Sequence, residues 1–382
     1  MSAGTASDAA LEALFVPFDT GELTLPAQGG VLLLRAREGV ALREHIRPGW
    51  VLQQSFAPAA NALARHRYTV IPDPPLAPVG ARPRATAPTE TVPPAQTSTP
   101  TQTSTPTQTF PYVLVLPTRQ REETRALFAQ AVTLAGSTGV VVASVPNAEG
   151  AKTAEADLAL LAGGVAQLSK HKCRVFWTLP GSTPDAALLD AWLALDAAEP
   201  IAGGRFSSRR GLFAWDRVDV ASALMASVLP DDLAGRVADL GAGFGYLACE
   251  VVARNAKVNA VDLFEAEGRA IGPARENIAA AIARSGRDVA ARVEWHDVTL
   301  GIDGRYDAIV SNPPFHQGRA DQPELGRAFI VTAARALAPG GRFWMVANRH
   351  LAYESTLDAC FGSVRTVLER DGFKVIEARE PR

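Results

Sequence analysis

Short apolar runs alternate with longer amphipathic stretches along most of this chain, most regularly from about residue 205 onward. The amphipathic stretches predict helices at Val220–Val228, Tyr246–Arg254, Ala266–Ala283 and Leu325–Leu337. The apolar runs predict strands at Arg236–Leu240, Lys257–Val261, Arg292–Trp295, Asp307–Val310 and Arg342–Val346. Strands separated by helical patterns indicate βαβ units and a parallel sheet. Two last runs, Val364–Glu369 and Phe373–Ala378, have no helix between them and predict an antiparallel hairpin.

The first half of the chain also predicts an α/β layer. We expect strands at Val31–Arg35, Val51–Ser55, Tyr112–Leu116, Val140–Val145 and Cys173–Leu179, and helices at Arg119–Leu134 and Thr153–Leu168. No glycine-rich turn follows these strands, and Leu116-Pro117-Thr118 stands where a cofactor loop would be expected. A sheet without such a loop is better suited to a scaffold or a substrate platform than to an active site.

A proline-rich segment interrupts this first half. Ile71–Pro111 holds 11 of the 27 prolines and repeats the hexad Gln-Thr-Ser-Thr-Pro-Thr at residues 96–107. Because nothing in it can bury an apolar face, we expect a disordered insertion at residues 72–111. An O-glycosylated stalk is the other interpretation, which the missing secretory signal disfavours. The length of 382 residues fits two domains, which we expect at residues 1–200 and 201–382.

Composition narrows the class of protein. The formal net charge of the 382 residues is -2, so any contact with nucleic acid must come from a local basic patch. The three cysteines are far apart and form no CxxC pair, which argues against zinc, other metal sites and a disulfide framework. No apolar run reaches the roughly 18 residues needed to cross a bilayer. We expect a cytoplasmic monomer that does not bind membranes.

A glycine turn follows the strand that ends at Leu240. In the run Asp239-Leu240-Gly241-Ala242-Gly243-Phe244-Gly245, the three glycines let the backbone approach a ligand where a helix begins. A dinucleotide fingerprint would need a glycine at Tyr246. The spacing suits a methionine-nucleoside better, with Asp239 facing its cationic amine, although a plain tight turn is the alternative. We therefore assign Asp239, Gly241, Ala242, Gly243 and Gly245 to cofactor binding.

Two further acids are expected at the same sheet edge. Asp262 closes the next predicted strand and can accept hydrogen bonds from both hydroxyls of a ribose. A helix N-cap is its alternative role, and Glu265 is a nearby substitute. Asp297 follows the third strand and can accept from an adenine amino group, unless it is a solvated loop acid.

The segment Asn312-Pro313-Pro314-Phe315 carries the predicted chemistry. The lone pair of an aromatic amine is delocalised, so the amine must be oriented towards the group it attacks. The Asn312 side-chain oxygen and the Pro313 carbonyl can accept from its N–H groups, while two prolines hold the loop rigid. Phe315 offers a stacking face for an extruded base. The alternative is a structural proline turn.

With the glycine turn about 70 residues upstream, this segment predicts an enzyme that transfers a methyl group from S-adenosylmethionine to an amino nitrogen on a planar group. The four residues are assigned to catalysis, and Asn312 also to the cofactor site. Arg209, Arg210, Arg319 and Arg349 are candidate phosphate contacts, although charged runs are more often solvated surface.

These motifs resemble the bacterial ribosomal RNA guanine-N2 methyltransferases of the RsmC/RlmG type. The resemblance spans about Phe206 to the C-terminus. It includes Gly211-Leu212-Phe213, Val218-Asp219-Val220, Asn312-Pro313-Pro314-Phe315-His316-Gln317 and Val346-Ala347-Asn348-Arg349-His350-Leu351. Ala242 stands where the family commonly has cysteine, and the Pro/Thr insertion is not a family feature.

The resemblance implies a C-terminal class I methyltransferase domain, with a Rossmann-like seven-stranded sheet ending in an antiparallel hairpin. It also implies a preceding degenerate α/β methyltransferase-like domain that has lost cofactor binding. The implied reaction is S-adenosylmethionine-dependent methylation of a guanine N2 in ribosomal RNA, with small-subunit RNA favoured over large-subunit RNA. Three alternatives stay open: transfer to adenine N6, transfer to a glutamine amide, and a non-catalytic RNA-binding assembly module.

Overall fold

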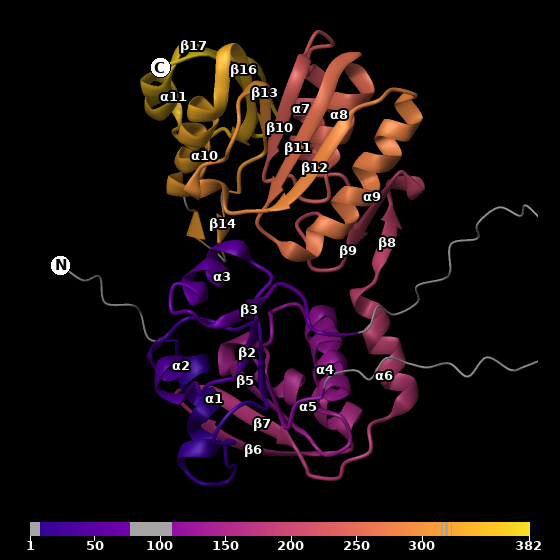
Figure 1. The fold of residues 1–382 in the computed structure, drawn as a ribbon, viewed down its shortest axis with the longest axis vertical. Helices are drawn as coiled ribbons and strands as arrows, with labels where there is room; N and C mark the ends of the chain where they lie inside the picture. Colours follow the sequence, from indigo (N-terminus) through magenta and orange to yellow (C-terminus); the bar gives the residue numbers. More distant parts are fainter. Residues whose placement is uncertain (1–7, 77–108, 315, 318–319, 322) are drawn as a thin grey trace, which may run out of the picture.

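The computed structural model describes residues 8–76, 109–314, 316–317, 320–321 and 323–382. They form two α/β domains stacked end to end (Figure 1). Most of the expected insertion, residues 77–108, lies outside the described residues. None of the helices in the described ranges is both long and apolar enough to cross a membrane.

The N-terminal sheet has seven strands in the order β3-β2-β1-β4-β5-β7-β6. Its members are β1 (Val31–Leu34), β2 (Val51–Gln53), β3 (Thr69–Ile71), β4 (Tyr112–Val115), β5 (Val140–Pro146), β6 (Val165–Lys170) and β7 (Cys173–Thr178). The accompanying helices are α1 (Ala9–Asp19), α2 (Val40–His45), α3 (Ala57–Ala64), α4 (Arg121–Ala135) and α5 (Ala151–Ala162). The first five strands in this order are parallel, whereas β7 is antiparallel to both of its neighbours.

The C-terminal sheet repeats this order as β12-β11-β10-β13-β16-β18-β17. Its strands are β10 (Ala234–Leu240), β11 (Lys257–Glu265), β12 (Ala290–Trp295), β13 (Tyr306–Ser311), β16 (Leu337–Asn348), β17 (Phe361–Arg370) and β18 (Phe373–Pro381). The helices are α7 (Val220–Val228), α8 (Tyr246–Arg254), α9 (Gly268–Ser285), α10 (Pro323–Ala336) and α11 (Glu354–Cys360). The predicted parallel sheet, its antiparallel closing hairpin and the second α/β copy are confirmed.

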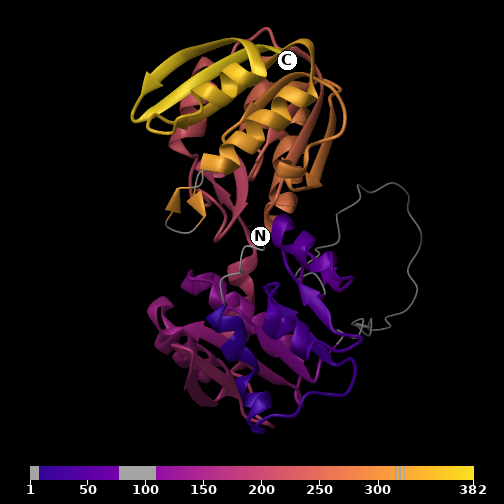
Figure 2. The ribbon, with the colours of Figure 1, turned by 90° about the vertical axis from the view of Figure 1, so that its left-hand side faces the viewer.

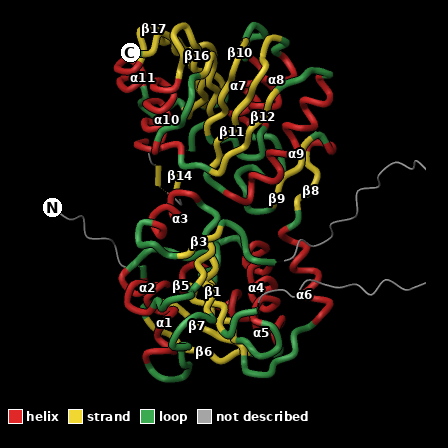
Figure 3. The backbone as a smooth tube through the Cα atoms, in the orientation of Figure 1, coloured by secondary structure: helices red, strands yellow, loops and turns green. Residues whose placement is uncertain are grey.

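Apolar side chains are buried on both faces of each sheet, as parallel sheets require. In the C-terminal domain, one cluster packs α7, α8 and α9 against the sheet, and another packs α10 and α11 against its opposite face. The N-terminal domain has the same two layers, with α4 and α5 on one face and α1 and α2 on the other. Figures 2 and 3 show the strands enclosed by helices in both domains.

Some predicted elements differ from the structure. The predicted helix Thr153–Leu168 is wrong at its end, because α5 stops at Ala162 and β6 starts at Val165. Gly163 and Gly164 have φ of 80° and 140°, a backbone that ends the helix and that residues with side chains rarely adopt. The pattern missed α1, which Asp8 caps by accepting from two backbone N–H groups.

A short connection joins the domains through α6 (Ala186–Leu193), the 3-10 turn η2 (Ala194–Asp196), and a hairpin of β8 (Ala198–Ile201) and β9 (Phe206–Arg209). The expected boundary at residue 200 falls inside this hairpin. The Asn277 side chain on α9 accepts from the Ser207 N–H and donates to the Ser207 carbonyl, at 2.7 and 2.8 Å. We infer from this attachment that the hairpin belongs with the C-terminal domain.

Candidate active site

The carboxyl ends of β10, β11, β12 and β13 meet at one edge of the C-terminal sheet, since these strands are parallel neighbours. The glycine turn follows β10. Its Gly241 and Ala242 N–H groups both donate to the Phe264 carbonyl, at 2.9 and 3.1 Å, which ties the turn to β11. Gly243 has a φ of 55° and nothing within 4 Å of where a side chain would begin. The turn therefore presents open backbone just before α8.

Asp239 lies on β10, directly before this turn, and is buried. Its Oδ2 accepts from the Ala248 N–H of α8 at 3.0 Å. Its Oδ1 is buried and has no hydrogen-bond partner among the described residues. Desolvation, followed by the nearby charge of Glu265, raises the pKa of Asp239 to about 7. An unsatisfied buried acceptor is costly, so this oxygen is suited to receive a donor from a bound ligand.

Glu265, and not Asp262, ends β11. The expectation that Asp262 closes its strand is wrong, because β11 pairs with β12 as far as Glu265 and Trp295. The Glu265 carboxylate accepts from the Gly243 N–H and from the Glu267 N–H, each at 2.7 Å. Desolvation raises its pKa, while these two backbone donors act in the opposite direction. Glu265 therefore touches the glycine turn itself.

Asp262 lies three residues deeper in the sheet. Its Oδ2 accepts from the Arg236 Nε at 2.9 Å and from the Tyr306 hydroxyl at 2.8 Å. Arg292 approaches the same oxygen at 3.5 Å. Asp262 is buried in this network. The position at the end of the strand belongs to Glu265, which the sequence suggested only as a substitute.

Asp297 lies at the expected edge, after β12. It caps the short 3-10 turn η4 (Val298–Leu300), where its Oδ1 accepts from the Thr299 N–H at 3.0 Å and from the Thr299 hydroxyl at 2.6 Å. Capping thus already occupies one of its oxygens.

Asn312 follows β13, and the structure orients its amide. Nδ2 donates to the Asp219 Oδ2 at 3.0 Å and to the Ser222 Oγ at 2.9 Å. Because both partners accept, the nitrogen faces them and the oxygen Oδ1 faces away. Asp219 is itself held, since it caps α7 by accepting from the Ser222 N–H at 2.8 Å. Sequence reasoning assigned no role to Asp219 or Ser222, although an acid just before a predicted helix is a recognisable cap signal.

The Asn-Pro-Pro loop and the glycine turn are in contact. Ser311 is fully buried and donates from its hydroxyl to the Leu240 carbonyl at 2.8 Å. A Cβ placed on Gly241 would lie 3.8 Å from the Pro314 Cδ and 3.2 Å from the Phe329 ring. Pro313 is buried and Pro314 is exposed. The predicted cofactor and catalytic segments are therefore neighbours, although Phe315 lies outside the described residues.

Two of the four candidate phosphate contacts, Arg209 and Arg210, are engaged by acidic partners. The guanidinium of Arg209 donates to the Asp196 carbonyl and carboxylate, and that of Arg210 to Glu199 and, on α4, to Glu122. These two arginines lie in ion pairs beside the domain interface, which leaves the prediction that they contact phosphate without structural support. Arg349 follows β16 at the carboxyl edge and is 68% exposed, with Glu369 at 3.5 Å. Arg319 lies outside the described residues.

Among the described residues of the N-terminal domain, no equivalent of the glycine turn follows β1. By strand order, β1 corresponds to β10 and β4 to β13, so Leu116-Pro117-Thr118 takes the place of the Asn-Pro-Pro loop and not that of a cofactor loop. Arg35 follows β1 and donates to the Ser55 Oγ at 2.7 Å and to Glu123. Its side chain thus occupies this part of the edge.

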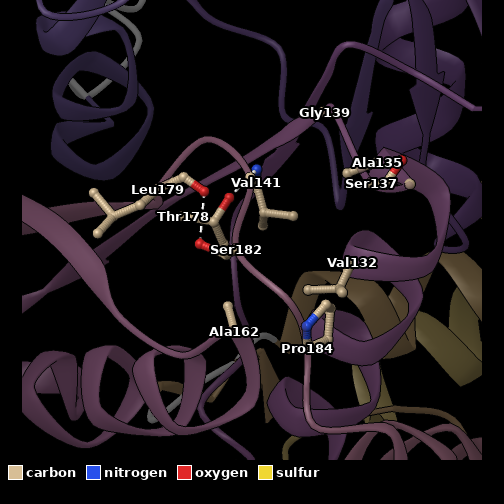
Figure 4. A pocket seen from close by; sticks show the side chains of 12 residues that line it. Val132, Ala135, Ser137, Gly139, Val141, Ala162, Thr178, Leu179, Ser182 and Pro184 are labelled. Atoms are coloured by element: carbon tan, nitrogen blue, oxygen red, sulfur yellow. Dashed lines mark hydrogen bonds between the residues drawn. The ribbon is translucent and has the colours of Figure 1, made fainter.

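A small pocket of the N-terminal domain, of about 20 Å³, lies between β5, β7 and the ends of α4 and α5 (Figure 4). The Thr178 hydroxyl accepts from the Val141 N–H there, and the Ser182 hydroxyl donates to the Leu179 carbonyl. Its volume suits about one water molecule, so it is too small for a nucleoside.

Comparison with known proteins shows what the chain is similar to. Residues 203–377 match the model of the family described as Methyltransferase small domain. The chain is 35% identical over 165 residues to the Ribosomal RNA small subunit methyltransferase C of Klebsiella pneumoniae, covering 43% of this chain and 46% of that protein. It is 30% identical over 243 residues to the protein of the same name from Yersinia enterocolitica, covering 62% and 66%.

These matches span about half to two thirds of the relatives' length. A solved structure described as a T. Thermophilus 16S rRNA N2 methyltransferase (RsmC) in complex with AdoMet and guanosine is similar over 98% of this chain and 92% of its own. Its TM-score is 0.70 and its sequence identity 22%, which shows a shared two-domain fold.

Proposed function

We propose, from the premise that the C-terminal half of this chain belongs to the methyltransferase small domain family, that the protein methylates the N2 amine of a guanine in small-subunit ribosomal RNA. Two relatives named Ribosomal RNA small subunit methyltransferase C match 43% and 62% of this chain, and the solved structure that shares its fold is described as a 16S rRNA N2 methyltransferase. The observation that carries the proposal is the fixed Asn312 amide beside the glycine turn.

The residues of the glycine edge fit S-adenosylmethionine. The unpartnered Asp239 Oδ1 is an acceptor for the ammonium of its methionyl part. Glu265, at the end of β11, is the acid best placed for the two ribose hydroxyls, a role first expected of Asp262. Asp297 retains its proposed role towards the adenine amine. When bound, this cofactor supplies an electrophilic methyl group on a positively charged sulfur.

Asn312 would orient the nucleophile. Its Oδ1, turned away from Asp219 and Ser222, accepts one N–H of the guanine amine, and the Pro313 carbonyl accepts the other. Held in this way, the nitrogen lone pair points at the methyl group instead of remaining conjugated with the ring. Methyl transfer from the bound cofactor would make this amine cationic, and the amine would then release its proton to solvent. Phe315 would stack on the extruded base.

The decisive experiment is methyl transfer with tritiated S-adenosylmethionine. Small and large ribosomal subunits from a strain that lacks this gene are incubated with the protein, and the nucleosides are then analysed. We expect label in N2-methylguanosine of the small subunit. Label in the large subunit alone would correct the substrate.

A failure of methyl transfer would also distinguish between the alternative functions. Label in neither subunit, together with measurable cofactor binding, would favour adenine N6 in DNA or a glutamine amide in a release factor as the target. Absence of cofactor binding would favour a non-catalytic RNA-binding module.

A further inference from the structure

The N-terminal domain contacts the loop that follows Glu265. Ser55–Ala57 lies antiparallel to Ala266–Gly268, and Phe56 and Glu267 form an isolated β-bridge. The Ala57 N–H donates to the Ala266 carbonyl at 2.8 Å, and the Gly268 N–H donates to the Ser55 carbonyl at 2.7 Å. Figure 1 shows α3, which begins at Ala57, at the top of the N-terminal domain against the C-terminal domain.

Trp295, the last residue of β12, joins this contact. Its indole Nε1 lies 2.7 Å from the Ser55 carbonyl oxygen and 2.8 Å from the Ala266 carbonyl oxygen, so one N–H is shared between the two domains. Ser55 is fully buried. A Cβ on Gly268 would lie 3.2 Å from the Ser55 oxygen, which shows how closely the two backbones approach. Interdomain hydrogen bonds therefore restrain both sides of Glu267.

The restrained loop leads directly to the candidate cofactor site. The Glu267 N–H donates to the Glu265 Oε1, and the other oxygen of Glu265 accepts from Gly243 in the glycine turn. A chain of contacts thus runs from Phe56 through Glu267 to Glu265 and Gly243. A loop that carries a binding group loses less entropy on binding when rigid neighbours already hold it.

We propose that Ser55–Ala57 of the N-terminal domain, together with Trp295, positions Glu265 for the ribose hydroxyls of the cofactor. The N-terminal domain thereby acts as a support for the cofactor site of its neighbour, besides any contact with RNA. This inference rests on the proposed function, because it takes S-adenosylmethionine as the ligand. Trp295 is a positioning residue, since it acts through Ala266 and not on the ligand.

The test measures selectivity for the ribose in the full-length protein. Calorimetry compares the binding of S-adenosylhomocysteine with that of its 2′,3′-dideoxy analogue, which lacks the hydroxyls. Trp295→Phe keeps an aromatic ring and removes the shared N–H. We expect it to weaken binding of S-adenosylhomocysteine roughly 3- to 10-fold, as loss of a hydrogen bond does. Binding of the dideoxy analogue should stay unchanged.

Two further variants sharpen the result. Trp344→Phe is the matched control, because the buried Trp344 Nε1 has no hydrogen-bond partner among the described residues and the substitution removes similar volume. It should leave the preference for the ribose intact. Ala57→Pro removes the N–H that donates to Ala266, at the first residue of α3, where proline suits a helix. It should reproduce the effect of Trp295→Phe. If one of the two variants fails to fold, the other still tests the proposal.

The outcomes separate the two proposals. If the unaltered protein binds neither ligand, the proposed function fails and this inference fails with it. If the unaltered protein prefers the ribose, and both Trp295→Phe and Ala57→Pro keep that preference or weaken both ligands equally, only the positioning role is overturned. Non-additivity between Trp295→Phe and Glu265→Gln in the same preference would support coupling through Glu265.

Discussion

At the scale of single residues, the orientation of the Asn312 amide depends on partners that are about 90 positions away. Asp219 and Ser222 accept from its nitrogen, and this leaves its oxygen for a substrate amine. Sequence reasoning predicted the role of Asn312 but could not predict what orients it, because α7 and β13 are brought together only by packing.

We expect Asn312→Ala to lower methyl transfer by roughly 100-fold or more, since it removes a preorganised acceptor. Binding of S-adenosylhomocysteine should change little. Single-turnover transfer and calorimetry check the two expectations separately. Asn259→Ala, on an exposed position of β11, is the control and should be neutral. Unchanged transfer in Asn312→Ala would refute the proposed orientation mechanism.

The raised pKa of Asp239 predicts that both stability and ligand binding depend on pH. Its pKa of about 7 lies above the ordinary value of 3.8, so the folded protein binds this proton more tightly than the unfolded chain does. Its contribution to stability therefore falls as pH rises from about 4 to 7. The carboxylate that accepts a ligand ammonium forms over the upper part of the same range.

We accordingly expect affinity for S-adenosylhomocysteine to rise with pH up to about 7, by at most about tenfold per unit. Asp239→Asn should bind more weakly at pH 7.5 and show a flatter profile. Calorimetry between pH 5.5 and 7.5 measures both slopes. A steep profile that survives in Asp239→Asn would assign the titration to another group.

At the scale of elements, the length of β11 decides which acid reaches the site. The strand continues in register with β12 to Glu265, so Asp262 remains inside the sheet with Tyr306 and Arg236. The tyrosine hydroxyl and the arginine satisfy one oxygen of Asp262. These contacts indicate that Asp262 supports the sheet.

This assignment predicts a separation of stability from binding. Tyr306→Phe removes a buried donor to Asp262 and should lower the free energy of unfolding by about 1 kcal/mol. Affinity for S-adenosylhomocysteine should be nearly unchanged. Urea unfolding and calorimetry measure the two quantities, with Tyr68→Phe in the N-terminal domain as the control. A tenfold loss of affinity with full stability would return Asp262 to the cofactor site.

At the scale of the whole molecule, buried charges connect the two domains. Arg269, at the start of α9, is 10% exposed and donates to Glu123 on α4 at 3.0 Å and to Asp196 at 2.9 Å. It also donates to the Arg210 carbonyl at 2.7 Å. The charges of Glu123 and Asp196 raise the pKa of Arg269 against the effect of burial.

We expect Arg269→Met to destabilise the protein by about 3 kcal/mol, because it removes the buried cation that Glu123 and Asp196 share and leaves each carboxylate with one other arginine, Arg35 or Arg209. The loss should include weaker docking of the domains, seen as two unfolding transitions in urea instead of one. Arg254→Met, which removes a more exposed pair with Glu250, is the control and should cost less than about 1 kcal/mol. Equal effects of the two variants would contradict a special role for Arg269 at the interface.

Much of the fold and part of the candidate site followed from the sequence alone. Asp239, the glycine turn and Asn312 each lie at the carboxyl end of a predicted strand. They meet at one edge of the sheet, because parallel strands bring their carboxyl ends together. The closing hairpin, the helices α7 and α8, and the α/β layer of the first half were predicted from local periodicity. These features depend on short stretches of chain, which a local pattern describes well.

Only the tertiary structure decided which side chains are available. The sequence presented Arg209 and Arg210 as candidate RNA contacts, but Asp196, Glu199 and the distant Glu122 bind them. The end of β11, the anchor of Asn312 and the contact of Ser55–Ala57 with Ala266–Gly268 likewise depend on partners far along the chain. The sequence by itself determined the chemical groups and their order, whereas packing between distant segments decided their partners, because no local pattern records which surfaces will meet.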